Sequence, residues 1–277
     1  MARILAISSQ VVSGHVGLSA MVPALQRLGH EVLPLPTVLL SNHPGQQAAA
    51  GTRIDPGVLI RILEALEANG RLLGIDAVLT GYLPDAAHVA VSHEAIRRVM
   101  ALNPSALIAC DPVIGDDPKG VYIDGAAAVA IRDTLVGSAG LITPNRFELS
   151  WLAGNPVTDA ASATSAARSL GLPLVVATSI PMTGDRLATL AITTDRVVEA
   201  SVPRRHTVPN GTGDLLAALF VSEYLANRTD PAAALQTAVG WVDRVLDASD
   251  GRRELDLSAD WRSARPDRSA DLRGEPL

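Results

Sequence analysis

The sequence predicts an α/β protein whose mostly parallel central sheet is covered by helices on both faces. Short runs of strand length alternate along the chain with segments of helical periodicity, and the runs are apolar throughout. Glycine or polar residues follow many of these runs directly, as expected where ligands bind beyond the carboxyl ends of parallel strands. The 277 residues, of which 48% are hydrophobic, suffice for one large α/β domain or two small ones.

The individual elements follow from these patterns in chain order. The apolar runs predict strands, the last two as a hairpin, over residues 4–7, 31–36, 77–80, 106–110, 141–143, 174–178, 187–193 and 197–202. The periodic segments predict helices over residues 16–28, 56–69, 85–102, 126–135, 146–152, 160–169, 213–226 and 231–246. We expect one domain over residues 1–257 that ends in an edge strand at 254–257. Mixed charge without apolar periodicity predicts a poorly ordered tail over residues 258–277.

Composition and charge exclude several classes of protein. A net charge of −6 without a basic stripe argues against a nucleic-acid partner. No segment approaches the roughly 20 apolar residues of a membrane span, and the short apolar N-terminal run reads as a first strand rather than a signal peptide. Cys110 is the only cysteine, which excludes an internal disulfide and a cysteine-based zinc site. These features predict a cytoplasmic protein without membrane association.

A glycine-rich loop before an apolar helix is the most informative motif. It reads Pro209-Asn210-Gly211-Thr212-Gly213-Asp214 and runs into residues 215–220. Glycines let backbone N–H groups approach an anion, and a helix N-terminus carries partial positive charge, so the loop can seat a transferring phosphate. Asp214 can take a proton from an attacking hydroxyl there. The alternative is a tight turn with Asp214 as the helix N-cap. The loop matches neither a Walker A motif nor a dinucleotide fingerprint.

Acidic residues gather at two other strand ends. Asp111 and Asp116 share one loop, and Glu148 lies in the first turn of a predicted helix. Magnesium prefers a few carboxylates together with phosphate oxygens and water, so these three residues are candidates for holding Mg-ATP. The alternatives are an aspartate that caps a turn before proline, and an Asn145–Glu148 capping box.

Hydroxyl and imidazole groups follow the first two strands. Ser8 and Ser9 can bind a polar small molecule, whereas His15 and His43 fit structural or substrate-edge hydrogen bonding better than general-base catalysis. Cys110 lies within an apolar run and reads as a buried small hydrophobe.

Six segments, 6–17, 41–43, 79–82, 110–116, 143–148 and 211–220, together resemble the motifs of the pyridoxal kinases, a vitamin B6 salvage branch of the ribokinase-like superfamily. Gly211-Thr212-Gly213-Asp214 marks the superfamily, whereas Ser41-Asn42-His43 and Thr80-Gly81-Tyr82 narrow the resemblance to pyridoxal kinases. The resemblance implies a three-layer αβα sandwich. It also implies ATP-dependent phosphorylation of the 5′-hydroxyl of pyridoxal, and of pyridoxamine and pyridoxine as well.

The resemblance also assigns roles to single residues. Asp214 matches the catalytic base and residues 211–213 the anion hole. Ser9 matches a group that binds the pyridine ring, with Thr37, His43 and Tyr82 around it. Asp111, Asp116 and Glu148 match the cation and phosphate cluster. The positions matched on the ATP side are Asp111, Asp116, Tyr122, Thr143, Asn145, Thr178, Gly211 and Thr212, with residues 119–122 as a flexible lid. Mg²⁺, a K⁺ ion and a homodimer are implied too.

Three departures from the family pattern bear on the substrate site and on the glycine loop. Asn210 replaces an apolar residue, Ser8-Ser9-Gln10 replaces the commoner Gln-Ser-His, and Pro44-Gly45-Gln46 lacks a tyrosine that many members carry.

The alternative functions are a hydroxymethylpyrimidine kinase of thiamine synthesis, a sugar kinase of the superfamily, or a non-catalytic carrier or sensor of pyridoxal 5′-phosphate. The preference among the three B6 compounds stays open.

Overall fold

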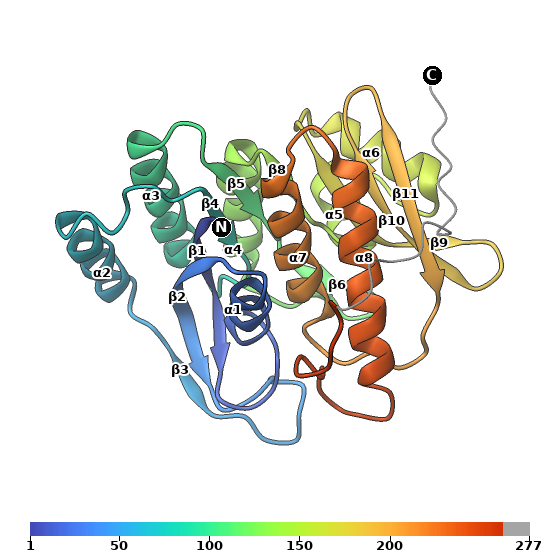
Figure 1. Cartoon of the computed structure of the whole chain (residues 1–277), viewed down its shortest axis with the longest axis horizontal. Helices are drawn as coiled ribbons and strands as arrows, with labels where there is room; N and C mark the ends of the chain where they lie inside the picture. Colours follow the sequence, from blue (N-terminus) through green and yellow to red (C-terminus); the bar gives the residue numbers. More distant parts are fainter. Residues whose placement is uncertain (263–277) are drawn as a thin grey trace.

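The computed structural model describes residues 1–262, and its centre is a nine-stranded sheet in the order β11-β10-β9-β8-β5-β4-β1-β2-β3 (Figure 1). Six neighbouring strands from β2 to β9 run parallel, and β3, β10 and β11 pair antiparallel at the two edges. The prediction of a mostly parallel sheet is therefore confirmed. The strands are β1 Arg3–Val11, β2 Glu31–Leu40, β3 Gly51–Arg53, β4 Ala77–Thr80, β5 Leu107–Cys110, β8 Leu141–Ile142, β9 Val175–Met182, β10 Arg186–Ile192 and β11 Val197–Pro203.

Helices cover both faces of this sheet and make the three-layer sandwich. One layer holds α1, α7 and α8, and the other holds α2 to α6 (Figure 1). The helices are α1 Leu18–Arg27, α2 Pro56–Ala68, α3 Ala86–Leu102, α4 Gly125–Ala130, α5 Arg146–Ala153, α6 Ala160–Ser169, α7 Thr212–Ala226 and α8 Pro231–Ala248. A π-helical turn, Ile131–Val136, continues α4. Within residues 1–262, no helix is long and apolar enough to cross a membrane.

The strands divide their side chains between the two helical layers. Leu5 and Ile7 of β1 pack with α2 to α6, whereas Ile4 packs with α1, α7 and α8. Because successive side chains of a strand point to opposite faces, a strand buried on both faces must be apolar throughout. The wholly apolar runs of the sequence are the direct result of this packing.

The structure corrects the expected end of the domain. Residues 254–257 form no strand; Leu255 and Leu257 are buried against the α1, α7 and α8 layer. Their backbone binds side chains instead, since the N–H of Asp256 donates to Ser249 and the carbonyl of Leu257 accepts from Arg27.

The boundary expected at residue 258 is also wrong. Trp261 is 1% exposed and meets Trp241 edge to face with 5.4 Å between ring centroids. An aromatic ring buried in this way belongs to the core of the domain. The rest of the expected tail, residues 263–277, lies outside the described residues.

Two small sheet elements escaped prediction. The edge strand β3 pairs with the end of β2 and closes an excursion of the chain between residues 40 and 51. The strands β6 Gly115–Asp116 and β7 Gly120–Val121 form a separate hairpin directly after β5. The hairpin lies beyond the carboxyl end of β5, and β3 lies alongside the carboxyl end of β2, near the predicted site residues of both segments.

Candidate active site

The glycine loop lies at the N-terminus of α7. Gly211 is the N-cap with φ +91°, and no side chain caps this helix. A Cβ at Gly211 would overlap the carbonyl oxygen of His15, so only glycine fits this close approach of two backbones. The hydroxyl of Thr212 donates to the carbonyl of Pro209 at 2.9 Å and closes the turn. The unpaired N–H groups of the first helical turn remain available for an anion.

Asp214 lies inside this first turn and is not its N-cap, so the interpretation as a simple capping turn is wrong. Burial raises the pKa of its carboxyl to about 6, and a hydrogen bond from the backbone N–H of Gly17 acts in the opposite direction. A carboxylate with a pKa just below neutrality is ionised at pH 7 and is still a useful proton acceptor. Its position and its proton affinity both suit a general base.

Asp111 stands at the end of β5 and is 7% exposed. Its Oδ1 accepts a hydrogen bond from the hydroxyl of Thr143 at 2.9 Å. Burial, together with the negative charge of Asp214, raises the pKa of Asp111 to about 7. Asp111 and Asp214 therefore lie close enough for their charges to repel each other in the free protein.

Glu148 is a buried carboxylate whose oxygens bind backbone N–H groups. Oε1 accepts from Ile114 at 3.0 Å and from Gly115 at 3.4 Å, and Oε2 accepts from Asn145 at 2.9 Å. Asn145 completes a capping box at the start of α5, as the alternative interpretation expected. Burial and the charge of Asp111 nevertheless raise the pKa of Glu148 well above its ordinary range. Glu148 therefore joins the β5–β6 loop to α5.

The remaining predicted residues of the ATP side surround these acids. The amide of Asn145 donates to the carbonyl of Gly115, and the N–H of Thr178 donates to the carbonyl of Pro144. Asp116 is exposed on the hairpin strand β6. Tyr122 follows β7, and loss of water together with the charges of nearby carboxylates raises the pKa of its phenol. The negative charges that act on Tyr122 come from Glu148, Asp111, Asp116 and Asp214.

The described residues contain no group of three histidine, cysteine or acidic side chains arranged to hold a metal ion. Of the three predicted metal ligands, Glu148 accepts hydrogen bonds from backbone N–H groups at both oxygens, which leaves Asp111 and the exposed Asp116 to face a cation. Two carboxylates suit a magnesium ion that keeps most of its ligands from water and phosphate. The donor set therefore fits Mg²⁺ bound together with a nucleotide better than a closed cage of protein ligands.

The predicted substrate residues lie around β1, β2 and the loop after β4. Thr37 is completely buried and its hydroxyl donates to the carbonyl of Tyr82 at 2.9 Å. The hydroxyl of Ser8 accepts from the N–H of Tyr82 at 3.0 Å, so both groups fix this loop. Ser9 is 9% exposed and lies against Gly17. Thr37 thus serves the scaffold of the site.

The two histidines differ in their surroundings. Burial and the positive charge of Lys119 lower the pKa of His43, whose Nδ1 accepts from the N–H of Gly45. The positive charge of the β6–β7 hairpin, at Lys119, therefore acts on the β2–β3 connection that carries His43. The Nδ1 of His15 is buried and has no hydrogen-bond partner among residues 1–262, while the His15 carbonyl lies against Gly211. Neither geometry makes a histidine the base.

Sequence reasoning missed Gly17 as a site residue. It belongs to the Gly14–Gly17 segment after β1, it lies against Ser9, and its backbone N–H lowers the pKa of Asp214. The sequence shows a glycine directly before a helix, but Asp214, on which Gly17 acts, is almost 200 residues away in the sequence.

The fold and the loop at α7 define a small-molecule kinase of the three-layer type. The chain matches the family model described as phosphomethylpyrimidine kinase over residues 13–254. It is similar to a pyridoxal kinase of Leifsonia xyli, with 39% identity over 92% of this chain and 93% of that protein. A pyridoxal kinase of Corynebacterium diphtheriae is 36% identical over 88% of each chain.

A solved structure agrees with these relatives. Pyridoxal kinase from Leishmania donovani, in complex with ADP and pyridoxamine, superimposes with a TM-score of 0.91 and 30% identity over 100% of both chains. A putative phosphomethylpyrimidine kinase from Bacteroides thetaiotaomicron has the same fold, with a TM-score of 0.89 at 24% identity over 99% of this chain and 98% of that one. The chain belongs to the pyridoxal kinase family.

Proposed function

We propose that this protein transfers the γ-phosphate of ATP to the 5′-hydroxyl of pyridoxal, and that it also accepts pyridoxamine and pyridoxine. The observation that carries the proposal is the pairing of Asp214 with the open first turn of α7. Relatives named pyridoxal kinase, and the Leishmania complex with ADP and pyridoxamine, support the choice of substrates.

Asp214 accepts the proton of the substrate's hydroxymethyl group as the hydroxymethyl oxygen attacks the γ-phosphorus, while the bond from the γ-phosphorus to the β,γ-bridging oxygen breaks and ADP leaves. The backbone N–H groups of Gly211, Thr212 and Gly213 and the dipole of α7 stabilise the negative charge on the transferring group. Losing one such donor typically costs about 3–4 kcal/mol of barrier. On the substrate side, Ser9 and Tyr82 orient the pyridine ring, and His43 lines the pocket around it. Thr37 holds the backbone of Tyr82 through its hydroxyl.

ATP lies along Thr143, Asn145, Thr178 and Tyr122 in this proposal, with its phosphates toward Asp111 and Asp116. Mg²⁺ held by these two aspartates, directly or through water, would neutralise phosphate charge. Glu148 holds the loop that leads to Asp116 through the backbone N–H groups of Ile114 and Gly115. A K⁺ ion near the same cluster, assembly as a homodimer and a cytoplasmic location are further proposals that rest on the resemblance and on composition.

The second candidate is phosphorylation of hydroxymethylpyrimidine, which the description of the matching family model favours. The test is release of ADP from Mg-ATP with pyridoxal, pyridoxamine, pyridoxine and hydroxymethylpyrimidine offered separately. Turnover of the B6 compounds supports the proposal and ranks them. Turnover of the pyrimidine alone contradicts it. Binding of pyridoxal 5′-phosphate without any turnover would identify a carrier or sensor.

A further inference from the structure

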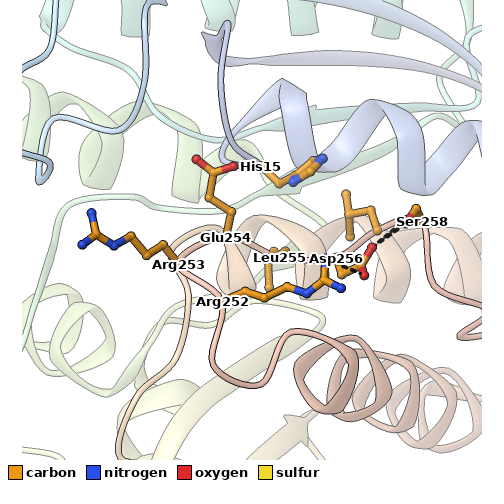
Figure 2. Close-up of a pocket in the computed structure, with 8 residues that line it drawn as sticks. His15, Arg252, Arg253, Glu254, Leu255, Asp256 and Ser258 are labelled. Atoms are coloured by element: carbon orange, nitrogen blue, oxygen red, sulfur yellow. Dashed lines mark hydrogen bonds and ion pairs between the residues drawn. The ribbon is translucent and has the colours of Figure 1, made fainter.

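The histidines outside the proposed chemistry differ in the partners of their ring nitrogens. Figure 2 shows His15 lining a cavity of about 450 Å³ together with residues 252–258, and its Nδ1 meets no hydrogen-bond partner among the described residues. The Nδ1 of His30 accepts from the N–H of Ala2 at 3.1 Å, so that ring is neutral with its proton on Nε2. His88 is unlike both.

His88 has an acceptor at each ring nitrogen. The ring lies in the first turn of α3 and is 1% exposed. Its Nε2 lies 2.9 Å from the carbonyl oxygen of Ile54, which can only accept, and its Nδ1 lies 2.7 Å from the Oδ1 of Asp85. A neutral imidazole has one N–H and can donate to only one of these oxygens. Both bonds form together when His88 is an imidazolium and Asp85 is ionised.

The other contacts of Asp85 favour its ionised form. Its carboxylate also accepts from the backbone N–H of His88 at 3.1 Å and from the guanidinium of Arg53 at 3.1 Å. Burial acts to raise the pKa of Asp85, but the hydrogen bonds from His88 and the charges of His88 and Arg53 bring that pKa below its ordinary value. Asp85 therefore supplies the opposite charge that a buried imidazolium needs.

The two bonds of the imidazole join segments that are distant in sequence. Ile54 follows the edge strand β3, whereas Asp85 is the N-cap of α3 and ends the loop that carries Tyr82. All three residues of β3 are exposed, so this strand gains little from burial and depends on its hydrogen bonds. His88 thus ties the end of β3 to the Tyr82 loop.

The β2–β3 connection, residues 41–50, follows the position of β3. The N–H of Ser41 donates to the carbonyl of Ala50 at 2.7 Å, and the amide of Asn42 donates to the carbonyl of Ala48 at 2.9 Å. These bonds close the connection on itself, so displacement of β3 also displaces His43 within it.

We infer that His88 is a positioning residue for the phosphate acceptor, because its doubly protonated ring fixes the β2–β3 connection against the Tyr82 loop. This inference rests on the proposed function, which places His43 and Tyr82 around the acceptor. Loss of the bond to Ile54 should weaken acceptor binding and leave the nucleotide side unchanged.

The first test reads the protonation state directly. The protein is labelled with ¹⁵N-histidine, and the ring nitrogens are observed at pH 7.5 through the carbon-bound ring protons. His88→Gln removes, and so assigns, the His88 signals. The internal references are His30 and His43, whose Nδ1 atoms accept backbone N–H groups and should carry no proton. We expect two protonated nitrogens in His88, and a neutral His88 ring would overturn the inference.

The second test separates the two bonds by substitution. His88→Asn keeps an amide that can donate to Asp85 but cannot reach Ile54, whereas the longer His88→Gln can donate to Ile54 without carrying charge. His93→Asn is the matched control, because His93 lies on the same helix and is only partly buried. Thermal unfolding, ADP affinity, kcat and the KM of pyridoxal are measured for each protein.

We expect His88→Asn to raise the KM of pyridoxal about tenfold, with ADP affinity within about twofold of the wild type. His88→Gln should recover most of this loss, and His93→Asn should behave like the wild type. An unchanged KM in His88→Asn, or an equal loss of ADP affinity, would overturn the inference. If His88→Asn does not fold, the wild-type spectrum and the KM of His88→Gln decide: a neutral His88 ring, or a KM raised as far as tenfold in His88→Gln, contradicts it.

Failure of the proposed function gives a different pattern. Hydrogen exchange of peptides covering residues 41–53 is followed in the same proteins, and it needs no knowledge of the acceptor. Faster exchange confined to this segment in His88→Asn supports the tie, and unchanged exchange refutes it. Absence of pyridoxal turnover in the wild type would refute the proposed substrate alone.

Discussion

Replacing Asp111 by asparagine should make the free protein more stable, at the expense of activity. Asparagine keeps an oxygen that can accept the hydrogen bond from Thr143 but carries no charge. In the wild type, burial and the charge of Asp214 raise the pKa of Asp111 to about 7 from the ordinary 3.8. That difference corresponds to about 4 kcal/mol of destabilisation once the group is ionised in the folded state.

The sign of the pH dependence follows from this raised pKa. Below about pH 4 the carboxyl is protonated in both folded and unfolded chains, so the substitution changes little. Between about pH 4 and 7 the folded chain binds a proton that the unfolded chain has lost, and wild-type stability falls as pH rises. The advantage of Asp111→Asn should therefore grow through this window and be complete above about pH 7.

The assay is thermal and denaturant unfolding of both proteins, without nucleotide or divalent cation, from pH 4 to 8. At pH 8 we expect the variant to melt about 8 °C higher, taking roughly 2 °C per kcal/mol for a domain of this size. Turnover with Mg-ATP should fall sharply. A variant no more stable than the wild type at pH 8, or equally stabilised at pH 4 and pH 8, would refute the reasoning.

Two further predictions concern the core and the base. Trp261→Ala should lower the free energy of unfolding by about 3–5 kcal/mol, because it empties a fully buried site beside Trp241. The control is Trp151→Ala, which removes a partly exposed ring. Both variants are measured by guanidinium titration, and equal losses of stability would contradict the packing account. The pH profile of kcat/KM should fall about tenfold per unit below about pH 6, as Asp214 becomes protonated; a flat profile from pH 5 to 8 would argue against this base.

The sheet could be predicted because its physical cause is local. A strand such as Ala77–Thr80 is buried on both faces, so its apolar run is visible without knowledge of its neighbours. The edge strand Gly51–Arg53 has three exposed residues and pairs only through its backbone, so no pattern reveals it. Leu255 and Leu257 alternate with polar residues like a half-buried strand, but they pack against helices. An alternating apolar pattern shows that one side of a segment is buried, but it does not show whether a strand or a helix covers that side.

The same distinction applies to the site. Asp214 and its loop could be found because a glycine loop, a carboxylate and an apolar helix are adjacent in sequence. The effect of Gly17 on the pKa of Asp214 could not, since folding alone brings the two together. Glu148 and Thr37 were predicted as ligand groups, but their polar atoms bind the protein's own backbone. Sequence shows which residues can hydrogen-bond, whereas the fold decides which of them remain free.

The central claim is that Asp214 is the base of a B6 kinase, and direct detection of the phosphorylated product tests it. Wild type, Asp214→Ala and the control Asp133→Ala are incubated with Mg-ATP and pyridoxal at pH 7.5, and pyridoxal 5′-phosphate is quantified by mass spectrometry. Asp133 is exposed and pairs with Arg132, away from the glycine loop. We predict product from the wild type and from Asp133→Ala, and a loss of at least about 100-fold in a normally folded Asp214→Ala. Near-normal product from Asp214→Ala would contradict the account.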